Sequence, residues 1–118
     1  MAFDGRSLAA WFHRAWLVLD TLVQTVGEAS NIQIWPEHFD AATDVPAGAG
    51  RANVGASPGD GFHPEPYFYV GPWDAARPGD DGYWNAPFGA FLDGDDRDDA
   101  AVVAWMEEGL SRLREPGT

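Results

Sequence analysis

The pattern of apolar and polar positions divides the chain into two helical segments with a region of short strands between them. From residue 8 to residue 26, apolar residues recur at steps of three and four, which is the spacing of one face of an α-helix. This stripe consists of Leu8, Phe12, Ala15, Leu19, Leu22 and Val26, and Trp11, Trp16 and Val23 widen it. A second stripe predicts a helix over residues 100–114. It consists of Val102, Val103, Met106, Leu110 and Leu113, with Trp105 beside it. Stripes this wide must pack against another layer.

Between the two helical segments the apolar pattern alternates with a period of two, as in β-strands. We expect extended segments at residues 32–35, 37–43 and 51–56, with a last short strand at Tyr83 and Trp84 and irregular structure over residues 85–94. The strongest strand signal is at residues 67–70. There the alternation places Tyr67 and Tyr69 on one face of the strand, with Phe68 and Val70 on the other.

The order helix, strands, helix predicts an α+β fold. Short consecutive strands with brief connections favour antiparallel pairing. We therefore predict a small antiparallel sheet of three or four strands, flanked by an N-terminal and a C-terminal helix that lie on one face. A chain of 118 residues fits one domain, covering residues 1–118. The aspartates between Asp93 and Asp99 lack the glycine and glutamate spacing of a calcium loop, so we interpret them as the N-terminal cap of the second helix.

Composition and charge exclude several classes of site and partner. The chain has no cysteine, so disulfides, thiolate zinc sites and cysteine nucleophiles are excluded. With 19 acidic and 7 basic residues the formal net charge is -12, which repels phosphates and anionic lipids, so we expect neither a nucleic acid nor a membrane as partner. The apolar stretches are too short to cross a bilayer, and the N-terminus lacks the features of a signal peptide. We expect a cytoplasmic protein.

The segment between Trp35 and Trp73 holds the residues best suited to chemistry. His38 is followed two positions later by Asp40, and His63 by Glu65. In an extended chain such pairs point to the same side. If the two stretches are neighbours, these four side chains converge, with Glu37 and Asp60 nearby. Three interpretations remain open: a site for a divalent metal held by His38, Asp40, His63 and Glu65, a metal-free polar pocket, or hydrogen bonds that merely order the loops.

A set of large aromatic residues predicts a binding face. Its members are Trp35, Tyr67, Tyr69, Trp73 and Trp84. Helices on one side of the sheet leave its other side uncovered, and an exposed apolar patch of this kind usually marks association. We expect a homo-oligomer or a protein partner, and the face is also compatible with a small-molecule ligand.

Residues 55–59 satisfy the Gly-x-Ser-x-Gly pattern of serine hydrolases around Ser57. In those enzymes a helix begins directly after the serine. Here Pro58 and Gly59 follow it, which break helices. The pattern therefore predicts a turn of small residues and no nucleophile.

Three longer motifs carry a resemblance: WPEHFD at residues 35–40, GASPGD at residues 55–60 and HPEPYFYVGPW at residues 63–73. With these motifs the chain resembles an uncharacterised family of bacterial proteins, a domain of unknown function. The resemblance implies that this chain corresponds to the C-terminal half of longer members, so a site shared between the halves would need a second copy or another chain. It implies no particular activity.

Taken together, the sequence favours a small binding or interaction module that self-associates or docks through its aromatic sheet face. The alternative is a small enzyme, either metal-dependent or metal-free, that uses His38, Asp40, His63 and Glu65. Nothing in the sequence completes a catalytic constellation around these four residues, which is why the binding hypothesis ranks first.

Overall fold

The computed structural model describes residues 5–26, 32–35, 40–47, 50–59, 62–73, 83–94 and 98–114. These residues form two helices and five strands. Helix α1 spans Gly5–Val26, helix α2 spans Asp99–Arg114, and the strands between them are β1 (Gln33–Trp35), β2 (Asp40–Ala47), β3 (Gly50–Ser57), β4 (Tyr67–Pro72) and β5 (Ala90–Asp93).

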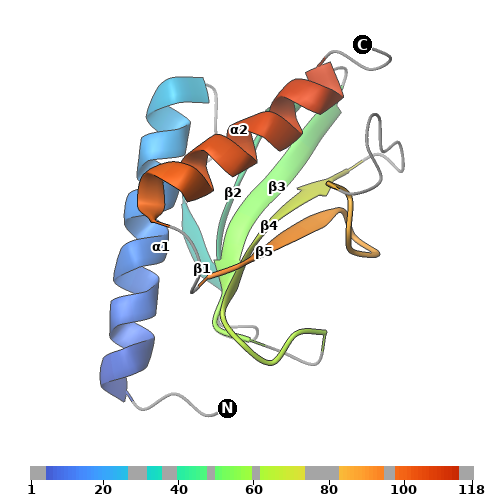
Figure 1. Ribbon diagram of the computed structural model, residues 1–118. Coiled ribbons are helices and arrows are strands. Elements are labelled where there is room, and N and C mark those ends of the chain that lie inside the picture. Colours follow the sequence, from blue (N-terminus) through green and yellow to red (C-terminus); the bar gives the residue numbers. More distant parts are fainter. Residues whose placement is uncertain are drawn as a thin grey trace.

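The strands form one sheet whose order follows the chain, and every neighbouring pair is antiparallel. Strands β2 and β3 form the longest hairpin, whose register ends at Ala47 opposite Gly50. Both helices cover the same side of the sheet (Figure 1), with α1 against β2 and β3 and α2 against β4 and β2. The predicted α+β arrangement is confirmed, and the sheet has five strands where three or four were expected.

The core lies between the helices and the sheet and follows the predicted alternation. Phe68 and Val70 of β4 are fully buried, and Trp11 of α1 lies against Phe68 with ring centroids 4.9 Å apart. The predicted stripe of α2 is buried or packed against this core. In α1, Val18 belongs to the buried stripe, whereas Trp16, which we expected to widen it, is 47% exposed. Trp16 follows the buried Ala15 directly, and one helical step of about 100° turns its side chain away from the sheet.

The last strand differs from the prediction. Tyr83 and Trp84 are not in a strand, and β5 lies within residues 85–94, which we expected to be irregular. In β5, Ala90 is buried in the core while Phe91 lies on the other side of the sheet, opposite Tyr69 of β4. Pairing with β4 creates this strand, since four residues between two glycines carry little strand signal of their own.

Tyr83 instead attaches the segment before β5 to helix α2. Its hydroxyl donates to the backbone carbonyl of Trp105 at 2.7 Å, and the guanidinium carbon of Arg112 lies 4.9 Å from the centre of its ring. Burial raises the pKa of Tyr83 well above its usual value, and the charge of Glu108 acts in the same direction. A Cβ atom at Gly109 would overlap the Tyr83 hydroxyl, so a glycine at this place in α2 makes the contact possible.

Arg14 joins the two helices where the chain passes from β5 to α2. Its Nε atom donates to Asp99 at 2.7 Å and its Nη1 atom donates to the carbonyl of Gly94. Its guanidinium carbon also lies 5.1 Å from the centre of the Phe68 ring. At the start of α2, Asp98 accepts the N–H of Ala101 at 2.8 Å, so the predicted aspartate cap is confirmed.

We call the side of the sheet opposite the helices the open face. It carries the strand positions that alternate with the core residues, among them Asp40, Asn53, Tyr69 and Phe91. Neither helix in the described part of the chain is long and apolar enough to span a membrane.

Candidate binding pocket on the open face

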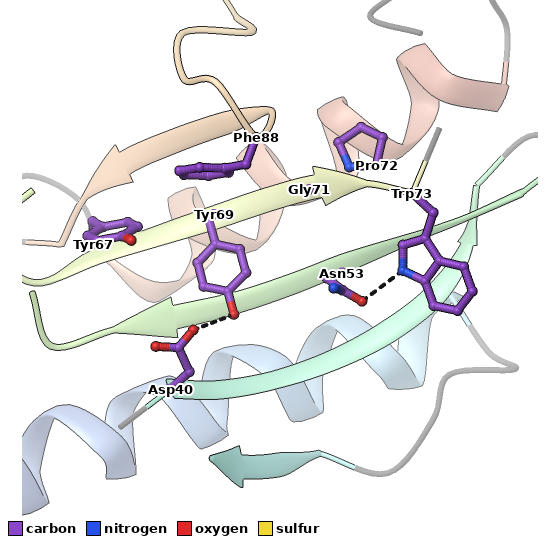
Figure 2. Close-up of a pocket in the computed structure, with 8 residues that line it drawn as sticks. All are labelled: Asp40, Asn53, Tyr67, Tyr69, Gly71, Pro72, Trp73 and Phe88. Carbon is purple, nitrogen blue, oxygen red and sulfur yellow. Dashed lines mark hydrogen bonds between the residues drawn. The ribbon is translucent and has the colours of Figure 1, made fainter. Parts of the chain in front are cut away.

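The open face is hollowed into a pocket of about 440 Å³. Its described lining comes from β2, β3 and β4, from the residue that follows β4, and from the turn before β5 (Figure 2). The lining residues are Asp40, Asn53, Tyr67, Tyr69, Gly71, Pro72, Trp73 and Phe88. A volume of this size is within the range of protein sites that enclose small ligands or side chains.

Tyr69 crosses the sheet to reach Asp40. Its hydroxyl donates to the Asp40 carboxylate at 2.9 Å, although the two residues lie on strands that β3 separates (Figure 2). The residue of β3 opposite Tyr69 is Gly55. A Cβ atom at Gly55 would lie 2.6 Å from the Tyr69 hydroxyl oxygen, so only glycine leaves room for the ring. The hydrogen bond holds the carboxylate in place at the pocket wall.

Gly71 leaves the middle of the pocket empty. It lies two positions after Tyr69 in β4, on the same face of the strand, and it pairs with Asn53 of β3. A Cβ atom at Gly71 would meet nothing closer than the Phe88 carbonyl oxygen at 3.6 Å. The missing side chain therefore creates space between Tyr69 and Trp73, where Figure 2 places Gly71.

Trp73 stands at the rim of the pocket. With 62% of its surface exposed it is the most exposed of the large apolar side chains described. Its indole N–H donates to the Asn53 side-chain oxygen at 2.9 Å (Figure 2), and its backbone N–H donates to the Arg51 carbonyl at 2.9 Å. Trp73 is thus exposed and also held in one orientation.

The turn before β5 supplies Phe88. Ala86 and Gly89 exchange two backbone hydrogen bonds of 3.1 Å, which closes the turn with Phe88 inside it. Gly89 has a φ angle of 150° and lies so close to the Val70 carbonyl that a Cβ atom would overlap it. Glycine is therefore required to bring this turn against β4. The Phe88 ring then lies edge-on to Tyr69, with centroids 6.1 Å apart.

Beside the pocket, further aromatic side chains form a cluster on the open face. Phe62 contacts Tyr67, Phe88 and Phe91 with centroid distances of 5.9, 5.1 and 5.3 Å. This cluster covers Tyr67, which is only 4% exposed, while Phe62 itself remains 43% exposed. The cluster supports the pocket wall from the β5 side.

Charged groups near the pocket are mainly acidic. Arg51 donates from its Nε atom to the carboxylate of Asp44 and from Nη2 to the Asp44 carbonyl at 3.1 Å, so these two charges offset each other. Asp40 lines the pocket, and Asp93 lies 3.2 Å from Nε2 of His63. Among the described lining residues, Asp40 is therefore the one with a carboxylate.

The structure brings together part of the predicted site. Asp40, Tyr67, Tyr69 and Trp73 line the same pocket. Trp84 does not belong to the aromatic face: it is 9% exposed and part of the core, where it lies against Tyr83 with centroids 4.8 Å apart. It is not in a strand, so strand alternation does not apply to it. Trp35 ends β1, and its side chain is outside the description.

Of the predicted polar pocket, Glu37, His38 and Asp60 lie outside the described residues. His63 contacts Asp93 of β5, and neither His63 nor Glu65 is among the described lining residues. Within the described ranges no three His, Asp or Glu side chains are grouped to hold a metal ion. Convergence of His38 with His63, the metal site and the enzyme hypothesis stay predictions. Ser57 is 1% exposed and accepts the Gly59 N–H at 3.1 Å, as expected for a turn.

Sequence reasoning missed half of the pocket lining. Asn53, Gly71, Pro72 and Phe88 were not among the candidates. The alternation of β3, with Ala52 and Val54 in the core, would have placed Asn53 on the open face. No comparable signal points to Phe88, because its position depends on a turn that folds back onto β4.

The chain was compared with known proteins, and no protein-family model, curated protein or solved structure matches it. The resemblance in the three motifs therefore stays a prediction.

Proposed function

We propose that this protein is a binding module that docks a partner protein through the open face, with Trp73 as the central contact. The observation that carries this proposal is a tryptophan that is 62% exposed at the rim of a pocket, while its indole and its backbone N–H each donate a hydrogen bond to β3. Tryptophan is among the residues that contribute most to binding energy when they pack into a partner.

Preorganisation favours such a role. An interface side chain that becomes ordered on binding reduces the affinity by the conformational entropy it loses. The hydrogen bond from Trp73 to Asn53 restricts the indole before any partner arrives. The aromatic cluster adds a rigid apolar surface that includes Phe62, which is 43% exposed. Both features support an interface that is formed in the free protein.

Charge indicates the kind of partner. With a net charge of -12, two copies of this chain repel each other, whereas a protein with a basic surface is attracted. We therefore propose a basic partner protein in the cytoplasm, and treat a second copy of the chain as the competing occupant.

The test compares the wild type with Trp73→Ala and Trp16→Ala. Trp16 is 47% exposed on α1, away from the pocket, so Trp16→Ala removes the same side chain from another surface. A protein captured from cells that make this chain is purified and titrated against all three forms by calorimetry. We expect Trp73→Ala to weaken binding at least about tenfold and Trp16→Ala to change it less than about twofold.

A partner that binds the wild type and Trp73→Ala equally well would contradict the proposal. Sedimentation equilibrium of the chain alone tests whether a second copy of the chain occupies the open face. If the chain forms a dimer and Trp73→Ala dissociates it, the open face binds a second copy, and the proposal of a basic partner is wrong. Circular dichroism of each variant confirms that it is folded.

A further inference from the structure

The pocket on the open face combines a carboxylate with aromatic rings in a confined space. Asp40 forms part of its wall, held by the Tyr69 hydroxyl at 2.9 Å. The rings of Tyr67, Tyr69 and Phe88 line the same pocket, and the indole of Trp73 lies at its other end, beyond Gly71 (Figure 2). We infer that this pocket binds the guanidinium group of an arginine side chain that the partner protein inserts. The inference rests on the proposed function and names the chemical group of the partner that the pocket accepts.

A cation fits this lining better than an anion or a neutral group. The faces of aromatic rings carry partial negative charge and attract cations, most strongly where water is excluded. Asp40 adds a carboxylate to the lining, and the net charge of -12 raises the local concentration of cations. Arg51, a cation of the same face, is already engaged by Asp44. An anionic ligand would be repelled by the Asp40 carboxylate and by the net negative charge of the chain.

A guanidinium group fits better than an ammonium group. It is planar and weakly hydrated, it stacks on aromatic rings, and it donates two parallel hydrogen bonds to a carboxylate. An ammonium group is compact and strongly hydrated, so it loses more solvation on entering an aromatic pocket. The hydrogen bond from Tyr69 orients the Asp40 carboxylate in the pocket wall.

The space available also fits a side chain presented by a protein. The pocket of about 440 Å³ is lined by glycine at its middle and is open at the Trp73 rim. A long side chain can enter from that rim while the partner's backbone rests on Trp73. This arrangement makes Asp40 the specificity contact and Trp73 the affinity contact.

The experiment uses Nα-acetyl-arginine amide and follows the indole N–H signal of Trp73 by NMR. Nα-acetyl-citrulline amide has nearly the same shape without the charge, and Nα-acetyl-lysine amide carries the other cation. We expect the arginine compound to bind with a dissociation constant on the order of 1 mM, the lysine compound more weakly, and the citrulline compound at least about tenfold more weakly. Equal binding of the arginine and citrulline compounds would overturn the inference.

Three variants locate the site. Asp40→Asn keeps the shape of the side chain and removes its charge, and we expect it to weaken binding of the arginine compound at least about tenfold. Asp20→Asn removes the same charge on the surface of α1, where Asp20 contacts Gln24, and should change binding less than about twofold. Gly71→Val fills the pocket and should abolish binding. Equal losses in Asp40→Asn and Asp20→Asn would reduce the effect to net charge and overturn the inference.

The two proposals fail in different ways. If the arginine compound does not bind but Trp73→Ala still weakens the partner complex, the guanidinium inference is wrong and the docking function stands. If the arginine compound binds but the partner complex is insensitive to Trp73→Ala, the pocket binds a free guanidinium compound. Both the docking function and the inference that the partner inserts an arginine are then overturned.

Discussion

Two glycines on the open face have opposite effects on the pocket. Gly55 is covered by the Tyr69 ring, so its missing side chain allows a contact. Gly71 is covered by nothing within 3.6 Å, so its missing side chain leaves a space. The same residue type thus builds the wall of the pocket at one position and its interior at the other.

This difference predicts opposite outcomes for the same substitution. In Gly55→Ala the new methyl group would lie 2.6 Å from Tyr69 and 2.7 Å from the Ala41 carbonyl oxygen, so both backbone and ring must shift. We expect the free energy of unfolding to fall by about 1–3 kcal/mol. In Gly71→Ala the methyl group has room, and the loss of glycine's freedom in the unfolded chain should leave stability unchanged or raise it by up to about 1 kcal/mol.

Urea denaturation of both variants measures these changes. Gly71→Ala serves as the control, because it adds the same atoms to the same face of the neighbouring strand. Equal destabilisation by the two substitutions would show that strand propensity, rather than the Tyr69 contact, determines the effect at Gly55.

At this scale the sequence predicts which face a residue occupies but not what it meets there. The alternation in β4 correctly separates Tyr67 and Tyr69 from Phe68 and Val70. The contact between Tyr69 and Asp40 joins strands 29 residues apart and depends on the register of three strands. Register is fixed by pairing across the whole sheet, so a single strand's pattern does not contain it.

At the scale of elements, the helices and long strands follow from local patterns, and the short ones do not. Helices α1 and α2 have apolar stripes of helical period, and their type was predicted correctly. Strand β5 has only four residues and exists because β4 pairs with it. Asn85 supports this edge strand, since its side chain bonds both the N–H and the carbonyl of Phe91. The pairing with β4 joins residues twenty or more positions apart, so a short sequence window does not contain it.

The contact of Tyr83 with α2 predicts a pH dependence of stability. Burial holds the Tyr83 phenol neutral in the folded chain and raises its pKa, whereas in the unfolded chain it ionises near its ordinary value of 10.0. Below that pH both states keep the proton, and stability from this group is fully present. As the pH rises above it, the unfolded state loses the proton first, so stability falls by at most about 1.4 kcal/mol per pH unit.

Urea denaturation between about pH 8 and pH 11 of the wild type and of Tyr83→Phe isolates this effect, because the two proteins differ in this one hydroxyl group. At pH 8 we expect Tyr83→Phe to be less stable by about 1 kcal/mol, since it lacks the bond to Trp105. The difference should shrink as the pH rises. Parallel curves for the two proteins across this range would contradict the buried, neutral phenol.

The contacts of Arg14 predict that the packing of the two helices depends strongly on this one side chain. It bonds Asp99 and the Gly94 carbonyl and lies over Phe68, so Arg14→Met removes three contacts at once. We expect a loss of about 2–3 kcal/mol in thermal or urea unfolding. Arg112→Met is the control, since it breaks an i,i+4 pair with Glu108 and a ring contact on the surface, for about 1 kcal/mol or less. Equal losses of stability in the two variants would mean that Arg14 contributes no more to the packing of the helices than Arg112 does.

At the scale of the whole molecule, the net charge of -12 acts on folding and on binding in opposite directions. Within one chain, the excess of carboxylates repels itself and lowers the stability of the compact state. Between this chain and a basic partner, the same excess speeds the encounter. Dissolved salt screens both effects, because the distance over which charges act falls from about 10 Å at 0.1 M to about 3 Å at 1 M.

Raising the salt concentration from about 50 mM to about 500 mM should therefore stabilise the free protein and slow its association with the partner. We expect the association rate constant, measured by stopped-flow fluorescence, to fall about tenfold or more, while the dissociation rate constant changes little. Trp73→Ala should show the reverse pattern, with faster dissociation and a similar association rate, because its contact forms only after the encounter. An association rate that does not depend on salt would mean that the acidic surface has no part in recognition, and the partner would then have to be selected by the shape of the aromatic face alone.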